Sequence, residues 1–222
     1  MAYNRRVTPL THPDTDTLAG ALAGRGVSIA VTPIPDHNIE DTVLAASRAG
    51  MEDDDYRILG LLVAWLDVHS ARLNADRLIQ LVRHATEPRV RAFWRAMARR
   101  WSNDRRWRRL ARLVSTPTEL LRTGNAFQIR RRGEDPRFVD TGLLVPVGVL
   151  RQRPGDVQAP AAVCQLHRAY RWRTIIGPSY RADVWAALES DGAMTASLLA
   201  RKTYAGFATA WQARRDFVIV HT

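Results

Sequence analysis

The chain has 222 residues, a net charge of +11 and a hydrophobic content of 46%. A chain of this length and apolar content can bury a sizeable core, which excludes wholesale disorder and favours one or two globular domains. Its one cysteine, Cys164, excludes an intramolecular disulfide framework and favours a reducing, cytoplasmic location. The first ten residues lack a long apolar run, and the most apolar window, residues 58–66, is too short to span a bilayer. Neither a secretory signal nor a membrane partner is therefore expected.

The positive charge is concentrated in the middle of the chain. Residues 87–134 hold fourteen basic and four acidic side chains, and residues 135–222 hold eleven and seven, whereas the residues before them are slightly acidic. The basic residues are 32 Arg and one Lys, so their position is more informative than the choice of Arg over Lys. A local excess of basic residues is typical of surfaces that meet phosphates.

Residues 1–125 predict an arm followed by a helical bundle. Prolines punctuate residues 1–36, which we interpret as an N-terminal arm with a short helix at 16–23 and a short strand at 27–31. Residues 37–125 carry apolar side chains at helical spacing, and their short connections favour antiparallel neighbours. The expected helices cover residues 38–49 and 53–73, a stretch capped by Asn74, residues 89–101, a stretch capped by Ser102 or Asn103, and residues 118–122.

Residues 126–158 change character and predict a small β insert with a linker. Alternating apolar and polar residues on either side of a turn at 133–136 predict a β-hairpin. Pro146 assigns the next apolar run to a sheet edge, because proline cannot donate to a ladder. The expected strands cover residues 127–130, 137–139 and 143–147.

The arginines between residues 89 and 112 have two interpretations. They form a phosphate-binding face, or they form a solvated face opposite a tryptophan-rich core. The spacing of four residues predicts that Arg91, Arg95 and Arg99 share one side of a helix. Arg105, Arg106 and Arg109 follow on the next helix. The nearby tryptophans keep the register of the apolar residues, which favours the core over base stacking.

No catalytic arrangement stands out. The sequence lacks a Gly-rich phosphate loop ending in Lys, a pair of His at metal-ligand spacing and a pair of Cys. His69 and His167 lie in predicted helices, where histidines are usually satisfied polar groups. We therefore expect no enzyme activity, no metal and no cofactor.

Residues 159–222 predict the domain on which function depends. A helix over residues 161–172 precedes three short helices between residues 182 and 217. Asp191-Gly192 ends the first of these, and Thr195 caps the second. The third begins near Phe207, and the residues after it, 218–220, predict one strand at most.

The second and third of these helices resemble the helix-turn-helix of bacterial DNA-binding regulators. The resemblance is carried by the small Ala200, by the turn over residues 202–206 and by Ala208-Thr209 near the start of the third helix. Tyr204 stands where such regulators usually have Gly. The resemblance implies a winged-helix-like domain that docks its last helix in the major groove of DNA, as a homodimer. A wing would have to be truncated or supplied by the hairpin at 127–150.

Helical spacing then assigns the side chains of the third helix. Ala205, Ala210, Ala213 and Phe217 are expected to face inward. Gln212 is expected to form two hydrogen bonds with adenine, and Arg215 is expected to bind guanine or a phosphate. Arg201, Lys202 and Arg214 are expected to contact the DNA backbone. The expected DNA-binding residues are Arg201, Lys202, Phe207, Trp211, Gln212, Arg214 and Arg215, joined by Arg91, Arg95, Arg99, Arg105, Arg106 and Arg109.

The sequence therefore predicts a mainly α fold with four consecutive parts. These are an arm (1–36), a helical bundle (37–125), a β-hairpin with a linker (126–158) and a helix-turn-helix domain (159–222). The expected function is a double-stranded DNA-binding transcriptional regulator. The alternative is a protein-interaction module, an antitoxin-like or phage-defence component, that holds a partner through Phe207 and Trp211.

Overall fold

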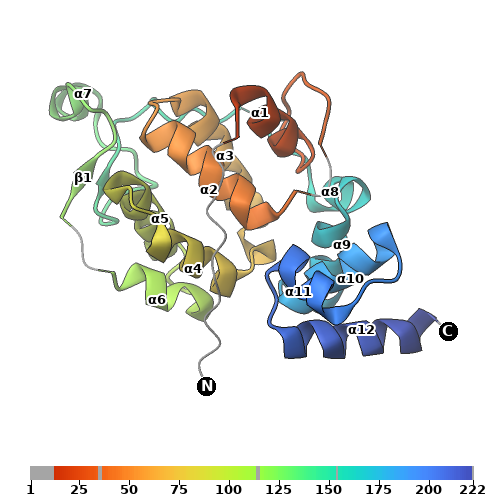
Figure 1. Cartoon of the computed structure of the whole chain (residues 1–222). Coiled ribbons are helices and arrows are strands. Elements are labelled where there is room, and N and C mark those ends of the chain that lie inside the picture. The colour runs from red at the N-terminus through yellow and green to blue at the C-terminus, as the bar shows by residue number, and fades with distance from the viewer. Residues whose placement is uncertain (1–12, 35–36, 114–115, 154, 222) are drawn as a thin grey trace. The chain divides into compact units, whose positions relative to one another are not determined.

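The fold is mainly α-helical. The computed structural model describes residues 13–34, 37–113, 116–153 and 155–221, and helices dominate these residues (Figure 1). Within this part of the chain the one sheet has two strands. The expected mainly α class is therefore confirmed. Parts of the expected arm, residues 1–12 and 35–36, lie outside the described residues.

The chain folds into two compact units. Unit 1 comprises Met1–Ile39, His69–Asn74 and Gln158–Thr222, and unit 2 comprises Glu40–Val68 and Ala75–Val157. This grouping differs from the four consecutive segments expected from the sequence, because a short middle segment and the arm join the C-terminal part. Unit 1 contains α1 (Thr15–Ala23), the 3-10 turn η1 (Ser70–Arg72), α8 (Pro160–Leu166), α9 (Arg168–Ile176), α10 (Tyr180–Asp191), α11 (Ala196–Thr203) and α12 (Phe207–His221).

Most of unit 2 is helical as well. Its elements are α2 (Ile39–Met51), α3 (Tyr56–His69), α4 (Ala75–His84), α5 (Pro88–Arg100), the 3-10 turn η2 (Arg105–Trp107), α6 (Arg108–Ala111), β1 (Thr118–Glu119), α7 (Asn125–Arg132) and β2 (Leu143–Leu144), with the end residues of α2 and α3 falling in unit 1.

The expected helices at 38–49 and 89–101 and the helix after Asn74 are confirmed, whereas the helix expected over 53–73 covers only Tyr56–His69. α5 begins at Pro88, whose missing N–H costs nothing in a first turn. Trp94 is fully buried and donates its indole N–H to the Ser47 hydroxyl, 2.8 Å away, which ties α5 to α2. The last stretch is capped by Asp104, not by Ser102 or Asn103, because the Asp104 side chain accepts from the Arg106 N–H.

The predicted β-hairpin is wrong. Residues 125–132 form α7, which begins after Gly124 and ends before Gly133. The apolar residues of this stretch are not a buried strand face, since Phe127 is 54% exposed. Asn125 instead anchors the helix start, because its side chain accepts from the Leu121 N–H and donates to the Leu144 carbonyl oxygen. An alternation of apolar and polar residues over only four positions was therefore not sufficient to predict a strand.

The predicted helix at 118–122 is also wrong. Its first residues form β1, which pairs in parallel with β2 in the register Thr118 to Leu143 and Glu119 to Leu144. The backbone N–H groups of Thr118 and Leu120 donate to the carbonyls of Gly142 and Leu144, each at 3.0 Å. The predicted strand at 143–147 is confirmed over its first two residues.

The predictions for the arm and for the start and end of the C-terminal part are confirmed only in part. α1 is confirmed and is capped by Asp14, whose side chain accepts from the Thr17 N–H at 2.7 Å. The predicted strand at 27–31 is wrong, since only Val27 makes an isolated bridge. The predicted helix over 161–172 is two helices, because His167 interrupts it and caps α9 with its ring. Residues 218–220 extend α12 and do not form a strand.

Candidate nucleic-acid interface

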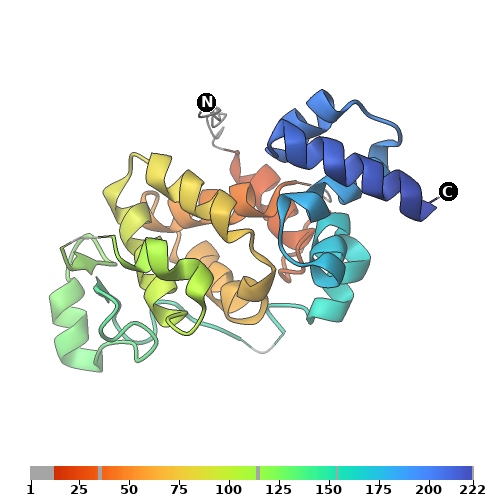
Figure 2. The same cartoon turned by 90° about the horizontal axis from the view of Figure 1, so that it is seen from below.

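The last three helices pack around a small shared core. Val184, Trp185, Ala187 and Leu188 of α10 meet Leu199 of α11, together with Ala205, Ala210 and Ala213. The Trp185 indole N–H donates to the Ala213 carbonyl oxygen at 3.0 Å, which fixes α12 against α10. Figures 1 and 2 show α12 as a straight helix with α10 and α11 on one side of it. One long face of α12 is consequently left outside this core.

The turn between α11 and α12 is tight. Thr195 caps α11 by accepting from the Leu198 N–H, as the sequence predicted. α11 ends at Thr203 and is followed by Tyr204, which adopts the left-handed conformation with φ of +58°. Residues other than Gly, Asn and Asp enter this region at a cost of about 1 kcal/mol. The next residue, Ala205, is 9% exposed, so the chain turns inward before α12 begins.

The outer face of α12 carries the predicted residues. Ala210 and Ala213 are buried and Phe217 is half-buried, which confirms the expected inward side. The predicted DNA-binding residues of this part are all exposed, namely Arg201, Lys202, Phe207, Trp211, Gln212, Arg214 and Arg215. The Arg215 guanidinium lies over the Trp211 ring, 5.2 Å from its centroid. The Gln212 amide donates to Asp216 at 3.0 Å, so it is held parallel to the helix.

The charges of this segment do not balance. All four carboxylates between residues 159 and 221 are in ion pairs with basic side chains of the same segment. The pairs are Arg171–Glu189, Arg173–Asp183, Arg181–Asp216 and Lys202–Asp191. Arg201, Arg214 and Arg215 make no ion pair with any described residue. The surplus positive charge of the segment therefore includes three exposed guanidinium groups on α11 and α12.

The arginines of α5, η2 and α6 lie in unit 2, and they are not alike. Arg91, Arg99, Arg105 and Arg109 are exposed. Arg95 is only 1% exposed, so Arg91, Arg95 and Arg99 do not form the exposed stripe along α5 that the sequence predicted. The middle of α5 is buried over residues 92–98, and regular spacing along such a helix does not imply a solvent-facing stripe.

Arg106 is also a poor candidate, because it is committed to an ion pair. Its Nε and Nη2 donate to both oxygens of Asp104, with an Nη2 to Oδ2 distance of 2.6 Å. The hydrogen bonds from Arg106 hold the pKa of Asp104 below its usual range, although burial opposes them. The pair fixes η2 and does not offer a free charge.

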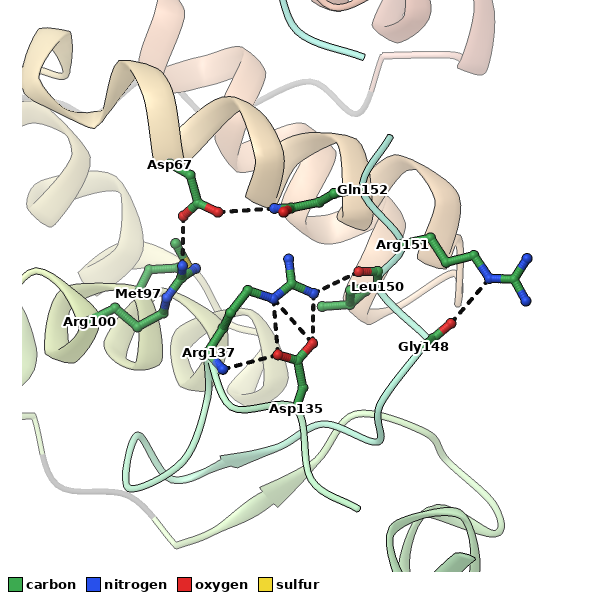
Figure 3. A network of polar contacts seen from close by, with 9 residues as sticks. All are labelled: Asp67, Met97, Arg100, Asp135, Arg137, Gly148, Leu150, Arg151 and Gln152. Atoms are coloured by element: carbon green, nitrogen blue, oxygen red, sulfur yellow. Dashed lines mark hydrogen bonds and ion pairs between the residues drawn. The ribbon is translucent and has the colours of Figure 1, made fainter. Parts of the chain in front are cut away.

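Other arginines of unit 2 serve the fold in the same way (Figure 3). Arg100 donates to Asp67 at 2.7 Å, and Gln152 donates to the other oxygen of that carboxylate at 3.0 Å. Arg137 forms a two-pronged pair with Asp135 and donates to the Leu150 carbonyl oxygen at 2.7 Å. Burial raises the pKa of Asp135, but the hydrogen bonds from Arg137 outweigh it and hold that pKa below its usual value. These pairs reduce the number of arginines that can meet a ligand.

Two histidines of unit 1 are buried structural groups, as the sequence predicted. The Nδ1 atom of His167 accepts from the Tyr170 N–H, and its Nε2 lies 3.2 Å from the His37 carbonyl oxygen. His69 lies between the Tyr170 hydroxyl, at 2.7 Å, and the Gln158 carbonyl oxygen, at 3.1 Å. Burial lowers the pKa of His167 to about 3 and that of His69 to about 4. Both rings are therefore neutral near pH 7 and do not act as acids or bases there.

One feature beside α12 was missed from the sequence. An open, mostly apolar cavity of about 270 Å³ lies between the end of α10 and the C-terminal half of α12. Leu188, Phe217 and Val218 line it, with Arg214 and His221 at its polar edge. It was missed because residues 218–221 were not expected to be helical. Among the described residues, no group of three His, Cys, Asp or Glu side chains is arranged to hold a metal ion.

Comparison of the chain with protein-family models, with curated proteins and with solved structures found no match. In the described ranges, none of the helices is both long enough and apolar enough to cross a membrane. The functional interpretation therefore depends on the side chains and charges described above.

Proposed function

We propose that this chain binds double-stranded DNA through a helix-turn-helix formed by α11 and α12, and that it acts as a bacterial transcriptional regulator. The observation that carries the proposal is the set of three exposed arginines without ion-pair partners, Arg201, Arg214 and Arg215, on a helix pair that packs on one side only. Unmatched guanidinium groups on an exposed helix are suited to phosphates and to base edges.

The position of each side chain suggests its role. Trp211 and Arg215 lie near the middle of α12, on the face opposite Ala210 and Ala213, so they would enter the major groove. Arg201 and Arg214 would grip phosphates on either side. Gln212 would read a base only after leaving Asp216, which makes it a weaker reader than the sequence suggested.

The exposed arginines of unit 2 extend the proposal. Arg91, Arg99, Arg105 and Arg109 would add phosphate contacts that do not depend on sequence. Arg95 and Arg106 have no part in this proposal, because the first is buried and the second is paired with Asp104.

The proposal is tested with a matched pair of triple variants. One replaces Arg201, Arg214 and Arg215 by Gln. The control replaces Arg130, Arg131 and Arg132, the exposed end of α7, by Gln, and therefore has the same net charge. Fluorescence anisotropy with a short mixed-sequence duplex is expected to show at least about tenfold weaker binding for the first variant and a much smaller loss for the control. Equal losses would mean that the chain attracts DNA only as a polycation.

A second candidate function has its own observation. The C-terminal half of α12 exposes Val218, Ile219 and Val220, at 49%, 66% and 63%, beyond the aromatic pair Phe207 and Trp211. Exposed apolar residues in such number favour a protein partner. Under this alternative the α11–α12 pair is a degenerate helix-turn-helix, and an Ile219→Asp variant loses its partner while its affinity for duplex DNA is unchanged.

A further inference from the structure

Arg95 is a buried cation with no counter-charge. It lies on α5 with 1% of its surface exposed. Its Nε and Nη1 atoms are buried and make no hydrogen bond, and no ion pair links the side chain to any described residue. Removing a charge from water without a partner costs several kcal/mol. Among the described residues, the other two arginines that are at most 1% exposed, Arg25 and Arg173, make hydrogen bonds with the chain itself.

A second guanidinium lies beside the first. A Cβ added to Gly142 would stand 2.8 Å from Nη2 of Arg95 and 3.3 Å from Nη1 of Arg99. Both guanidinium groups thus approach the backbone of residue 142 closely, and a side chain at this position would collide with them. Arg99 also donates to the Thr141 carbonyl oxygen at 3.1 Å and is exposed, so it is the solvent-accessible member of the two.

The surroundings do not neutralise the two charges. Arg95 and Arg99 make no ion pair with any described residue, and the carboxylates Asp67 and Asp135 of the same unit are paired with Arg100 and Arg137. The pKa of Arg95 is lowered from its usual value, first by burial and second by the like charge of Arg99. A site with two adjacent cations and no anion is electrostatically incomplete.

We propose that Arg95 and Arg99 together bind a phosphate group beside Gly142. A guanidinium offers a planar fork of donors that matches two oxygens of an oxyanion. Phosphate has more acceptor oxygens and a higher charge than a carboxylate, so one phosphate can accept from both groups and balance both charges. Arg95 would provide the buried end of the site and Arg99 its entrance. The phosphate is either free inorganic phosphate or a phosphate of a nucleic-acid backbone, and the site does not depend on the role proposed for α12.

The test is calorimetric titration of the full chain with inorganic phosphate at constant ionic strength, with acetate as the comparison anion. Wild type is expected to bind phosphate saturably at one site. Arg99→Gln is expected to weaken binding at least about tenfold, because a charge-assisted hydrogen bond is lost. Arg95→Met is expected to lose binding but to fold, since an apolar side chain of similar length suits a buried position.

Glycine variants provide a steric control. Gly142→Ala places a methyl group against both guanidinium groups and is expected to block phosphate. Gly148→Ala is the matched control, because Gly148 has the same φ of +83° in the same unit and has nothing within 4 Å of its added Cβ. Equal phosphate binding by wild type, Arg95→Met and Arg99→Gln would overturn the proposal, as would the absence of saturable binding by wild type.

A further titration with duplex DNA distinguishes the two sources of phosphate. If DNA displaces inorganic phosphate, and if Arg95→Met weakens the binding of DNA, the ligand is a backbone phosphate. If DNA affinity is unchanged in Arg95→Met while phosphate binding is lost, the ligand is the free anion. The α12 triple variant should keep its phosphate affinity in either case, so a failure of the DNA proposal does not appear as a failure of this site.

Discussion

Arg173 of α9 and Asp183 of α10 form a buried, two-pronged ion pair. Nε and Nη2 of the arginine each lie 2.8 Å from an oxygen of the carboxylate, and the two side chains are 0% and 7% exposed. The remaining Nη1 donates to the Arg72 carbonyl oxygen at 3.2 Å. The pair joins α9 and α10 to η1, and each charge depends on the other because both side chains are buried.

Removing one member of this pair is expected to be costly. Asp183→Asn should lower the free energy of unfolding by about 3–5 kcal/mol, because Arg173 is left buried and charged. The double variant Arg173→Met with Asp183→Leu should recover most of that loss, since it buries no charge. Chemical denaturation of the single and double variants provides the measurement. A single variant as stable as wild type would show that the pair is exposed to water in solution.

Acid is expected to destabilise unit 1 through His69 and His167. Their pKa values of about 4 and about 3 in the folded chain are below the ordinary value of about 6.5 that applies when unfolded. The unfolded chain therefore binds these protons first as pH falls. Stability is complete above about pH 6.5 and is lost toward pH 3, by about 2 kcal/mol for each ring at pH 5.

The acid prediction is checked with His167→Asn. Asn retains an acceptor for the Tyr170 N–H but cannot titrate, so the loss between pH 7 and pH 5 should shrink by about 2 kcal/mol. A wild-type unfolding free energy that is constant between pH 7 and pH 5 would contradict the burial of both rings.

The left-handed backbone at Tyr204, in the turn before α12, determines which substitutions this position tolerates. Tyr204 has a φ of +58°, a region that Asn tolerates and that β-branched residues avoid. Both Tyr204→Asn and Tyr204→Val lose the tyrosine ring, but the Asn variant should be more stable than the Val variant by about 1–2 kcal/mol. Thermal melting of the two variants measures the difference. Equal stability would indicate that residue 204 leaves the left-handed region in solution.

Trp211 separates the two candidate functions. Its ring lies under the Arg215 guanidinium, and a cation–π contact at an exposed site contributes about 0.5–1 kcal/mol. If α12 binds DNA, Trp211→Ala should weaken duplex binding by about threefold, because Arg215 is no longer held in place. The exposed Val220 is on another side of the helix, and Val220→Ala should have no effect. Unchanged DNA affinity with loss of a bound protein would favour the interaction module instead.

The long amphipathic helices of this chain could be predicted from the sequence, whereas the short strand β1 and the short helix α7 could not. α5 and α12 were predicted from apolar residues that repeat at helical spacing over several turns. Thr195 was identified as a helix cap because capping depends only on the residues that directly follow it in the chain. β1 pairs with a strand more than twenty residues later, so no local pattern could reveal it. Phe127 belongs to a short helix whose start is fixed by Asn125, in part through a bond to the carbonyl oxygen of Leu144, 19 residues later in the chain.

Some properties of the candidate DNA-binding residues could likewise be predicted from the sequence, and others could not. Exposure of Trp211 and Arg215 followed from the helical period of α12. The burial of Arg95 did not follow from period, because it depends on what covers the middle of α5. Ion pairing is equally invisible in the sequence, and it removes Arg106 from the set of available cations.

The salt dependence of duplex binding tests the DNA-binding proposal most directly. The logarithm of the association constant of wild type should fall linearly with the logarithm of the salt concentration, with a slope set by the number of phosphates contacted. Arg214→Gln should reduce that slope by about 1, whereas Arg131→Gln on α7 should leave it unchanged. Wild-type binding that ignores salt, or the same slope in all three proteins, would contradict the assignment of α12 as the DNA-binding helix.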